Sequence, residues 1–502
     1  MEFFQKELNL LQFFLVFLHM KNIHMKKILL SLSVLLVLPL FAETDFIRVS
    51  KENPRYFETN GKCWIPNGYN LAFPRPFFYD KSDDEAFELI EKQISALAAN
   101  GGNYIRIWTS AGFYEFETAA GVFDEKKLAR LDRLMALAEK YGIRVKLCLE
   151  HFRNVKKYTP VDAERGLPVD MFSKSIYSGD FKNMIEYLES EKGKIFYLAR
   201  AKKLADRYRD NPYVFGIELW NEGDTVSVWP RVGLMEKWTA EMLPRVKKLF
   251  PNHMIMQSLG SFSEYCMYGR CYEYANIAGN DVAQVHRYLD LGATMDICKG
   301  PIDIFASDSV RVLREMSKTK PVVLAETGAV KPNHAGPSEL YEKDAEGSIL
   351  HDILFSAFYS GAAGAGQCWH WEAYILKNNL YWQFGRFAKA VEGLNPIAEN
   401  FEPFRADTKT LRVYGLNGKN TLTAWIRDNS SDWRSEIERG EKPKTVSSAE
   451  LDFARFIGSR KAAKAQVYNP WTDKSVEVEL KNGKLRLPDF KKSVVVKIKF
   501  GE

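Results

Sequence analysis

Between about residues 62 and 400, short apolar segments rich in strand-forming residues alternate with longer segments whose apolar residues recur at helical spacing. This spacing predicts helices over 84–99, 124–141, 191–209, 231–250, 308–318, 341–360 and 382–392. Strands are predicted at 63–65, 103–108, 143–149, 213–220, 253–257, 281–286, 321–326 and 366–371. Eight strand–helix alternations predict an α/β fold of the (β/α)8 barrel type rather than an open sheet.

The pattern changes after Pro403. Segments 410–414, 421–426 and 493–498 alternate in polarity or run apolar, and Asn-Gly turns stand at 417–418 and 482–483. Short strands separated by such turns are typical of a small antiparallel β-sandwich. We therefore expect a barrel domain over 43–403, with an N-terminal hairpin that turns at Asn60-Gly61, and a sandwich over 404–502 packed against it.

The amino terminus has the pattern of an export signal. Met25-Lys26-Lys27 precedes an apolar run over 28–41, and Ala42 is followed by polar residues. A basic start, a short apolar run and a small residue at the boundary are typical of a secretory signal. We expect residues 1–42 to be a signal peptide, with 1–24 an upstream extension, and the mature chain to be secreted or periplasmic. The run is too short for stable membrane insertion.

Charge and cysteine spacing narrow the classes of partner. The net charge of +6 is modest for 502 residues, and Lys and Arg are interspersed with acidic residues. Nucleic-acid binding needs a clustered basic face, so no nucleic-acid partner is predicted. No Cys-x-x-Cys or His-x-x-x-His spacing predicts a metal site, and no cofactor is implied. Cys266 and Cys271 are close enough in sequence to form a disulfide in an oxidising compartment, which stays open.

Two glutamates end predicted strands about 100 residues apart: Glu222 in Gly-Ile-Glu-Leu-Trp-Asn-Glu, and Glu326 in Pro-Val-Val-Leu-Ala-Glu. Catalytic residues of such barrels lie at the carboxyl ends of the strands. Retaining glycoside hydrolysis uses two carboxyl groups, one that transfers a proton and one that attacks the sugar carbon. The pair therefore predicts a glycosidase acting on a poly- or oligosaccharide.

The ordered set of strand-end residues resembles clan A glycoside hydrolases, closest to family 5, which contains cellulases and β-mannanases. The resemblance covers about residues 62–400 and includes Trp220-Asn221-Glu222, Glu326, His286-Arg287-Tyr288, Arg106, His151 and Trp369. It implies that Glu222 is the acid/base and Glu326 the nucleophile of an endo-β-mannanase or a cellulase-like enzyme. Gly223-Asp224 stands where many members carry proline, which leaves the subfamily open.

The resemblance also implies a substrate-binding set around the two glutamates. Arg106 and Tyr288 are expected to hold Glu326 charged and oriented, and Asn221 to donate to the sugar 2-hydroxyl. His151 is expected to bind a sugar hydroxyl or Asn221, and His286 to line the sugar subsite. Trp369 and Trp371 are both candidates for the stacking position, which only one of them can occupy.

Other interpretations stay open. The first is a non-catalytic carbohydrate-binding barrel, and the second is an exported aldolase or isomerase, for which no strand end shows a convincing lysine, phosphate loop or metal set. Loops 152–190 and 329–341 can wall the cleft into a pocket or line a groove. The sandwich can bind sugar through Trp433 or Trp471, or buttress the barrel.

Overall fold

The computed structural model describes residues 45–74, 82–151, 155, 176–177, 179–226, 228–260 and 262–501. The predicted signal segment, and the loop over 152–190 up to residue 175 except residue 155, lie outside the described residues. Within the described part of the chain, no helix combines the length and apolarity that a membrane crossing needs.

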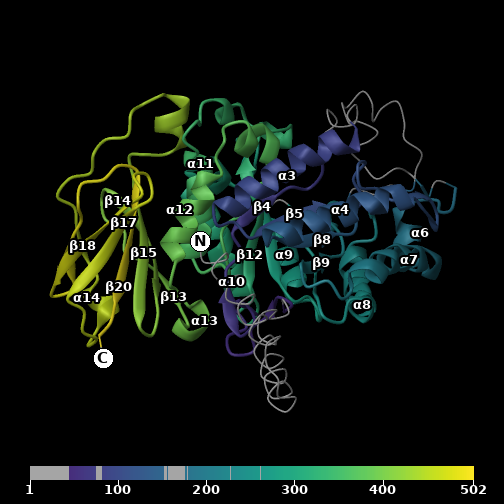
Figure 1. Ribbon diagram of the computed structural model, residues 1–502, viewed down its shortest axis with the longest axis horizontal. Coiled ribbons are helices and arrows are strands. Elements are labelled where there is room, and N and C mark those ends of the chain that lie inside the picture. Colours follow the sequence, from purple (N-terminus) through teal and green to yellow (C-terminus); the bar gives the residue numbers. More distant parts are fainter. Residues whose placement is uncertain are drawn as a thin grey trace, which may run out of the picture. The chain divides into compact units, whose positions relative to one another are not determined.

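Parallel strands form the centre of the barrel domain (Figure 1). The strands β4 (Gly68–Asn70), β5 (Tyr104–Trp108), β8 (Arg144–Cys148), β9 (Val214–Glu218) and β10 (Met254–Met256) pair in the order β10-β9-β8-β5-β4. A second parallel pair joins β11 (Ala283–Leu289) to β12 (Val322–Ala329). The Phe262 amide donates to the His286 carbonyl at 2.7 Å, which links the segment after β10 to β11. The residues of β5, β8 and β9 are all buried, as expected of strands covered on both faces.

Helices follow the strands in sequence: α3 (Asp83–Ala99), α4 (Glu125–Tyr141), α7 (Glu191–Tyr208), α8 (Leu234–Leu249), α9 (Met267–Asn276), α10 (Ile302–Met316), α11 (Ser348–Tyr359) and α12 (Trp382–Val391). Local signals explain their ends. Ser82 and Glu85 form a reciprocal capping box at the start of α3, and Gly142 ends α4 in the left-handed conformation. The α/β barrel fold predicted from the alternation is therefore confirmed.

Short elements complete the chain. A hairpin of β2 (Phe57–Thr59) and β3 (Lys62–Trp64) turns at Asn60-Gly61 and pairs with β1 (Arg48–Val49). The remaining short pieces are β6 (Glu117–Ala119), β7 (Val122–Phe123), α6 (Met184–Glu189), α13 (Pro396–Glu399) and α14 (Ala454–Ile457). Phe57 packs with Tyr104, Phe215 and Val323 in one apolar cluster, so the hairpin covers buried barrel residues.

Three sequence predictions need correction, and one question that the sequence left open concerns Cys266 and Cys271. The eighth barrel segment is no continuous strand: it pairs through isolated bridges of Cys368 to Tyr69 and Thr327, because a π-helix begins at Trp371. Helix α10 begins at Ile302, six residues before the predicted start. Gly347, left-handed at φ 72°, starts α11, so the predicted helix over 341–360 is shortened. Cys266 and Cys271 are free thiols, one exposed and one buried.

The C-terminal body is an antiparallel sheet, yellow-green in Figure 1, with strand order β13-β14-β15-β20-β17-β18-β19-β16. Its strands are β13 (Glu402–Arg405), β14 (Leu411–Asn417), β15 (Thr421–Asp428), β16 (Glu450–Asp452), β17 (Lys464–Asn469), β18 (Lys474–Lys481), β19 (Lys484–Arg486) and β20 (Ser493–Lys499). Tight turns at Asn417-Gly418 and Asn482-Gly483 join β14 to β15 and β18 to β19, as predicted. The sheet begins at Glu402, inside the range assigned to the barrel from sequence.

Buried ion pairs attach this sheet to barrel helices. Arg427 of β15 donates two hydrogen bonds to Asp352 of α11, at 2.9 and 3.2 Å. Arg412 and Tyr414 of β14 both donate to Asp303 of α10, at 2.5 and 2.7 Å. Trp433 donates its indole N–H to the Gly300 carbonyl. These contacts agree with the buttress interpretation of the sandwich.

We predict that Arg427→Met lowers the free energy of unfolding by about 3–5 kcal/mol, because it leaves Asp352 buried without its cation. Arg427 is fully buried and Asp352 is 5% exposed. Urea unfolding followed by tryptophan fluorescence measures the loss. Arg439→Ala, which breaks an ion pair to Glu441 that is more than half exposed, is the matched control, with an expected loss of about 0–1 kcal/mol. Equal losses in both variants would contradict the prediction.

Candidate functional site

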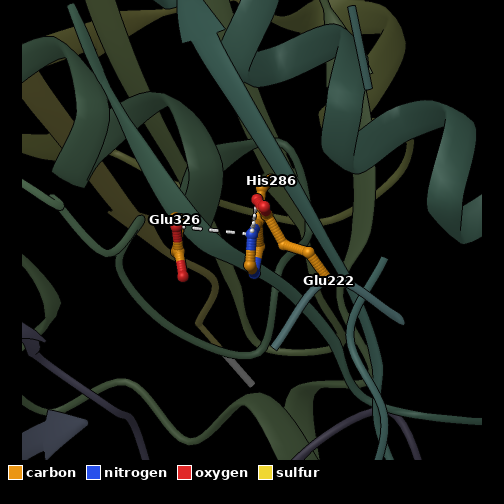
Figure 2. Close-up of side chains that lie close together, drawn as sticks. All are labelled: Glu222, His286 and Glu326. Carbon is orange, nitrogen blue, oxygen red and sulfur yellow. Dashed lines mark hydrogen bonds and ion pairs between the residues drawn. The ribbon is translucent and has the colours of Figure 1, made fainter. Parts of the chain in front are cut away.

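Three side chains, one after β9 and one each on β11 and β12, converge at the carboxyl ends of the barrel strands. Figure 2 shows His286 between Glu222 and Glu326. His286 Nδ1 lies 2.7 Å from Glu222 Oε1 and 3.4 Å from Glu326 Oε2. One oxygen of each glutamate and one ring nitrogen of His286 lie within 4.8 Å of one another. The structure thus brings together the two glutamates that the sequence singled out.

Local backbone geometry directs Glu222. The residue follows β9 and adopts φ 51°, in the left-handed region that residues other than glycine rarely occupy. Its amide donates to Ser258 Oγ at 2.9 Å, and the Gly223 amide donates to the Ser258 carbonyl at 3.3 Å. Such a conformation costs about 1–3 kcal/mol and persists only where surrounding contacts impose it. Ser258 therefore holds the turn that presents Glu222.

Glu326 is held through both of its oxygens. Arg106 Nη1 contacts Oε1 in a buried ion pair, and the Tyr288 hydroxyl donates to Oε2 at 2.7 Å. The parallel register pairs His286 with Glu326 and Tyr288 with Gly328, so β11 places two groups against one carboxylate. The Glu326 side chain is 4% exposed. This arrangement fixes one orientation of the carboxylate.

A polar network lies in the barrel interior around Arg106. Its Nε donates to Glu218 Oε2 at 2.7 Å, and its Nη2 donates to Glu218 Oε1 at 3.0 Å and to Asn221 Oδ1 at 2.7 Å. Asn70 Oδ1 accepts from Nη1 at 3.2 Å. Lys146 Nζ lies 3.2 Å from Glu218. Bidentate pairing fixes the plane of a guanidinium, so Glu218 orients Arg106 beneath Glu326.

Burial and nearby charges act in opposite directions on the pKa values of Glu222 and Glu326. Burial raises the pKa of Glu222, while the charges of His334 and Arg106 oppose that rise. Burial also raises the pKa of Glu326, opposed by His286, by Arg106 and by the Tyr288 hydrogen bond. Glu326 is thus the glutamate in direct contact with a permanent cation, which favours its charged form.

The pKa values of His286 and Glu218 are instead lowered. Burial lowers the pKa of His286 to about 4, so its ring is neutral at neutral pH. Although burial alone would raise it, Arg106 and Lys146 lower the pKa of Glu218 to about 2. Glu218 is therefore ionised and pairs with Arg106 throughout the pH range of ordinary enzyme activity.

Aromatic residues flank Asn221. Its amide nitrogen lies 3.5 Å from His151 Nδ1, and the His151 ring packs on Trp108 with centroids 3.5 Å apart and planes tilted by 31°. Burial, with the nearby Arg106 charge, lowers the pKa of His151 well below its ordinary value, so the ring is neutral. Of the two predicted contacts of His151, the one to Asn221 is present.

The structure separates the two candidate stacking tryptophans. Trp369 packs beside Trp108, with ring centroids 4.6 Å apart, and keeps partly exposed surface. Trp371 is fully buried and meets Trp369 edge-on at 5.1 Å. A buried indole face cannot stack on a sugar, so the prediction that Trp371 lines the cleft is corrected, and Trp369 is the candidate of the two that keeps exposed surface.

Glu222, His286 and Glu326 are also close enough together to ligate a cation. Their surroundings do not fit one well. Arg106 already contacts one Glu326 oxygen, and a divalent ion placed beside that buried guanidinium would be repelled by it. The donor set therefore fits proton transfer better than metal ligation.

Sequence reasoning missed Asn70, Glu218, Lys146, Ser258 and Gln284. Lys146 Nζ donates to Gln284 Oε1 at 2.9 Å, so a lysine, a glutamate and a glutamine from three strands meet in the interior. One signal was available: charged residues interrupt two predicted strands that are otherwise apolar, Arg144 and Lys146 in the first and Glu218 in the second. Buried charges are normally paired, so such a residue indicates a partner on another strand.

Comparison with known proteins agrees with this geometry. The model of the family described as cellulase (glycosyl hydrolase family 5) matches residues 80–354, more than half of the chain. The chain therefore belongs to glycosyl hydrolase family 5 and is a glycoside hydrolase.

Relatives and a solved structure extend the comparison. Mannan endo-1,4-beta-mannosidase 7 of Arabidopsis thaliana is 26% identical over 350 residues, covering 62% of this chain and 75% of the relative. Mannan endo-1,4-beta-mannosidase 3 of Oryza sativa subsp. japonica is 23% identical, covering 73% and 79%. A crystal structure of a glycoside hydrolase family 5 protein from Bacteroides vulgatus superposes with a TM-score of 0.55, at 12% identity, over 91% of this chain and 95% of that one. This likeness shows the fold.

Proposed function

We propose that the protein is a retaining β-glycoside hydrolase that cleaves a β-linked mannan by double displacement, with Glu326 as nucleophile and Glu222 as acid/base. The observation that carries the proposal is the spacing of the two carboxyl groups, whose nearest oxygens lie within 4.8 Å. Retaining pairs stand about 5–5.5 Å apart, whereas inverting pairs leave about 6.5–9.5 Å for a water molecule.

In the first step, a Glu326 oxygen attacks the anomeric carbon while the bond from that carbon to the leaving oxygen breaks. Glu222 transfers its proton to the leaving oxygen, which departs as a hydroxyl group. In the second step, Glu222, now a carboxylate, takes a proton from water, and the water oxygen displaces Glu326 from the anomeric carbon. Two displacements return the original configuration, and Glu222 ends protonated as it began.

The surrounding residues support these roles. Arg106 and Tyr288 stabilise the charge of Glu326 before attack and after its release. Asn221 is fixed by Arg106 and contacts His151, which leaves its amide placed to donate to a sugar hydroxyl. Neutral His286 contacts both carboxyl groups, so it accommodates a proton on Glu222 without adding charge.

The substrate class follows the relatives, two of which carry the name mannan endo-1,4-beta-mannosidase. The test is hydrolysis of β-mannan by the purified chain beside cellulose, xylan and mixed β-glucan, with the anomer of the first product followed by NMR. A first product of retained configuration from mannan supports the proposal. Inversion would reject the mechanism, preference for another glycan would reject the substrate, and binding without hydrolysis would favour a non-catalytic barrel.

We also propose that the chain is exported, on the basis of the basic-apolar-small pattern ending at Ala42. Export is tested by expressing the full sequence and determining the amino terminus of the protein outside the cytoplasm. A chain retained inside the cell with its first 42 residues intact would reject the proposal.

The pH profile of Tyr288→Phe gives a prediction with a defined sign. The Tyr288 hydrogen bond lowers the pKa of Glu326, so its loss raises that pKa. Because Glu326 must be ionised to attack, the acid limb of kcat/KM moves to higher pH. We expect kcat/KM at the optimum to fall about tenfold to a hundredfold, as for a lost hydrogen bond to a charged group.

Tyr208→Phe is the matched control, since Tyr208 donates to Asp132 at 2.6 Å between outer helices. Its acid limb is expected to coincide with that of the unmodified enzyme. An acid limb that stays in place in Tyr288→Phe would contradict the assignment of Glu326 as the ionised group.

A further inference from the structure

A short loop, residues 330–337, follows β12, the strand that carries Glu326, and its two ends are hydrogen-bonded to each other and to β11. Val330 bridges to Pro337, and the Val330 amide donates to the Leu289 carbonyl at 2.9 Å. The Lys331 amide donates to the Gly336 carbonyl at 2.9 Å. The backbone hydrogen bonds thus return the chain to the rim of the barrel a few residues after it leaves.

Two adjacent residues at the tip of this loop have an unusual backbone. Asn333 has φ 60° and His334 has φ 59°, both in the left-handed region. Neither is a glycine. Two consecutive non-glycine residues rarely adopt the left-handed conformation unless other contacts impose it. Such outliers cluster at ligand sites, which is a reason to ask what imposes this one.

Asp290, at the end of β11, imposes the conformation. Its Oδ1 accepts from the amides of Gly292 at 2.7 Å and Asn333 at 3.0 Å, and its Oδ2 lies 2.9 Å from His334 Nδ1. Gly292 packs so closely on the tip that an added Cβ would lie 2.5 Å from the Asn333 nitrogen. Asp290 is 4% exposed, so a buried carboxylate joins the two loops.

These contacts place the His334 ring beside the reacting groups. The ring meets the Tyr288 ring edge-on, with centroids 4.9 Å apart, and Tyr288 is the residue that donates to Glu326. The side chain is 39% exposed. Among the residues that the structure describes, Asp290 provides the hydrogen bond to this ring, and it engages Nδ1. Nε2 is therefore available to a ligand.

We propose that His334 is a substrate-binding residue, which accepts a hydrogen bond at Nε2 from a hydroxyl of the sugar that lies against Tyr288. This inference rests on the proposed function and deepens it. Asp290 offers only acceptor atoms, so Nδ1 must carry the proton and the neutral ring presents Nε2 as an acceptor. A protonated ring would instead donate to the same hydroxyl oxygen.

The electrostatics of the site agree with this position. A positive charge on His334, carried when the ring is protonated, lowers the pKa of Glu222 and opposes the effect of burial.

The experiment compares His334→Phe with the unmodified enzyme on a soluble manno-oligosaccharide. Phenylalanine keeps a ring edge against Tyr288 but offers no hydrogen bond. We expect KM to rise about threefold to tenfold, the effect of one net hydrogen bond, with kcat changed less than about twofold. His334→Gln, which keeps an acceptor, is expected to restore KM to within about twofold of the unmodified value.

Lys331→Ala is the control in the same loop, because the ion pair that the described residues give Lys331 is with exposed Glu339. An unchanged KM in His334→Phe would overturn the inference, as would a fall in kcat alone, which is the result expected if His334 merely orients Tyr288. An equal rise in KM in Lys331→Ala would also overturn it. Failure of the proposed function looks different, because the unmodified enzyme would then release no sugar from mannan.

Discussion

Replacing Glu326 by alanine is expected to lower kcat on mannan by ~10⁴-fold or more, because no covalent intermediate can form without the attacking carboxylate. Glu326 is 4% exposed, and its two oxygens are held by Arg106 and Tyr288. Reducing-sugar release under saturating substrate measures the loss. Glu339→Ala is the matched control, since Glu339 is 82% exposed beyond the end of the same strand and is expected to leave the rate unchanged.

Azide distinguishes loss of the nucleophile from loss of folding. The alanine leaves a space beside Arg106 that a small anion can enter, and azide can attack the anomeric carbon from the side that Glu326 occupied. With an aryl β-mannoside of good leaving group, a single displacement yields the α-mannosyl azide. Recovery of this product requires an intact site. A β-configured azide, or full activity without azide, would reject Glu326 as the nucleophile.

Much of the site could be predicted because parallel strands present their carboxyl ends at one rim. Glu222 and Glu326 each follow an apolar strand, and Tyr288 lies two positions beyond His286 on one strand, which puts both on the same face. Arg106 could be placed by the same alternation within β5. For such residues, chain order and strand period suffice to predict that they meet.

Contacts between distant segments could not be predicted in this way. Asp303 is buried near the start of α10 because Arg412 and Tyr414, more than 100 positions later, donate to it. In the sequence it is a charged residue that interrupts the apolar stripe, so the predicted helix began too late. His334 and Asp290 are similarly joined only through the packing of two loops. Their pairing has no local signal.

The choice between Trp369 and Trp371 depended on the segment that closes the barrel. A regular strand would point both side chains to the same face. The chain instead makes bridges at Cys368 and enters a π-helix at Trp371, so the second indole turns into the core. The direction of a side chain could not be predicted from the sequence where the backbone departs from the regular two-residue period of a strand.

Replacing Glu222 by alanine is expected to affect substrates according to their leaving group. Hydrolysis of mannan needs a proton on the departing sugar oxygen, so kcat/KM is expected to fall about 10²–10⁴-fold. A dinitrophenyl β-mannoside has a leaving group that departs as an anion without that proton, and its kcat/KM is expected to fall less than about tenfold. Initial rates on the two substrates measure the difference. An equal loss on both would argue against an acid/base role.

The same variant also tests the second step and the pH profile. Without Glu222 no base activates water, so the covalent intermediate on Glu326 accumulates, and added azide, which needs no base, releases it as the β-mannosyl azide. This product has the configuration opposite to that expected from Glu326→Ala. The alkaline limb of kcat/KM for mannan is expected to disappear, because the group with the burial-raised pKa has been removed. Identical azide anomers from the two variants would contradict the roles assigned to Glu222 and Glu326.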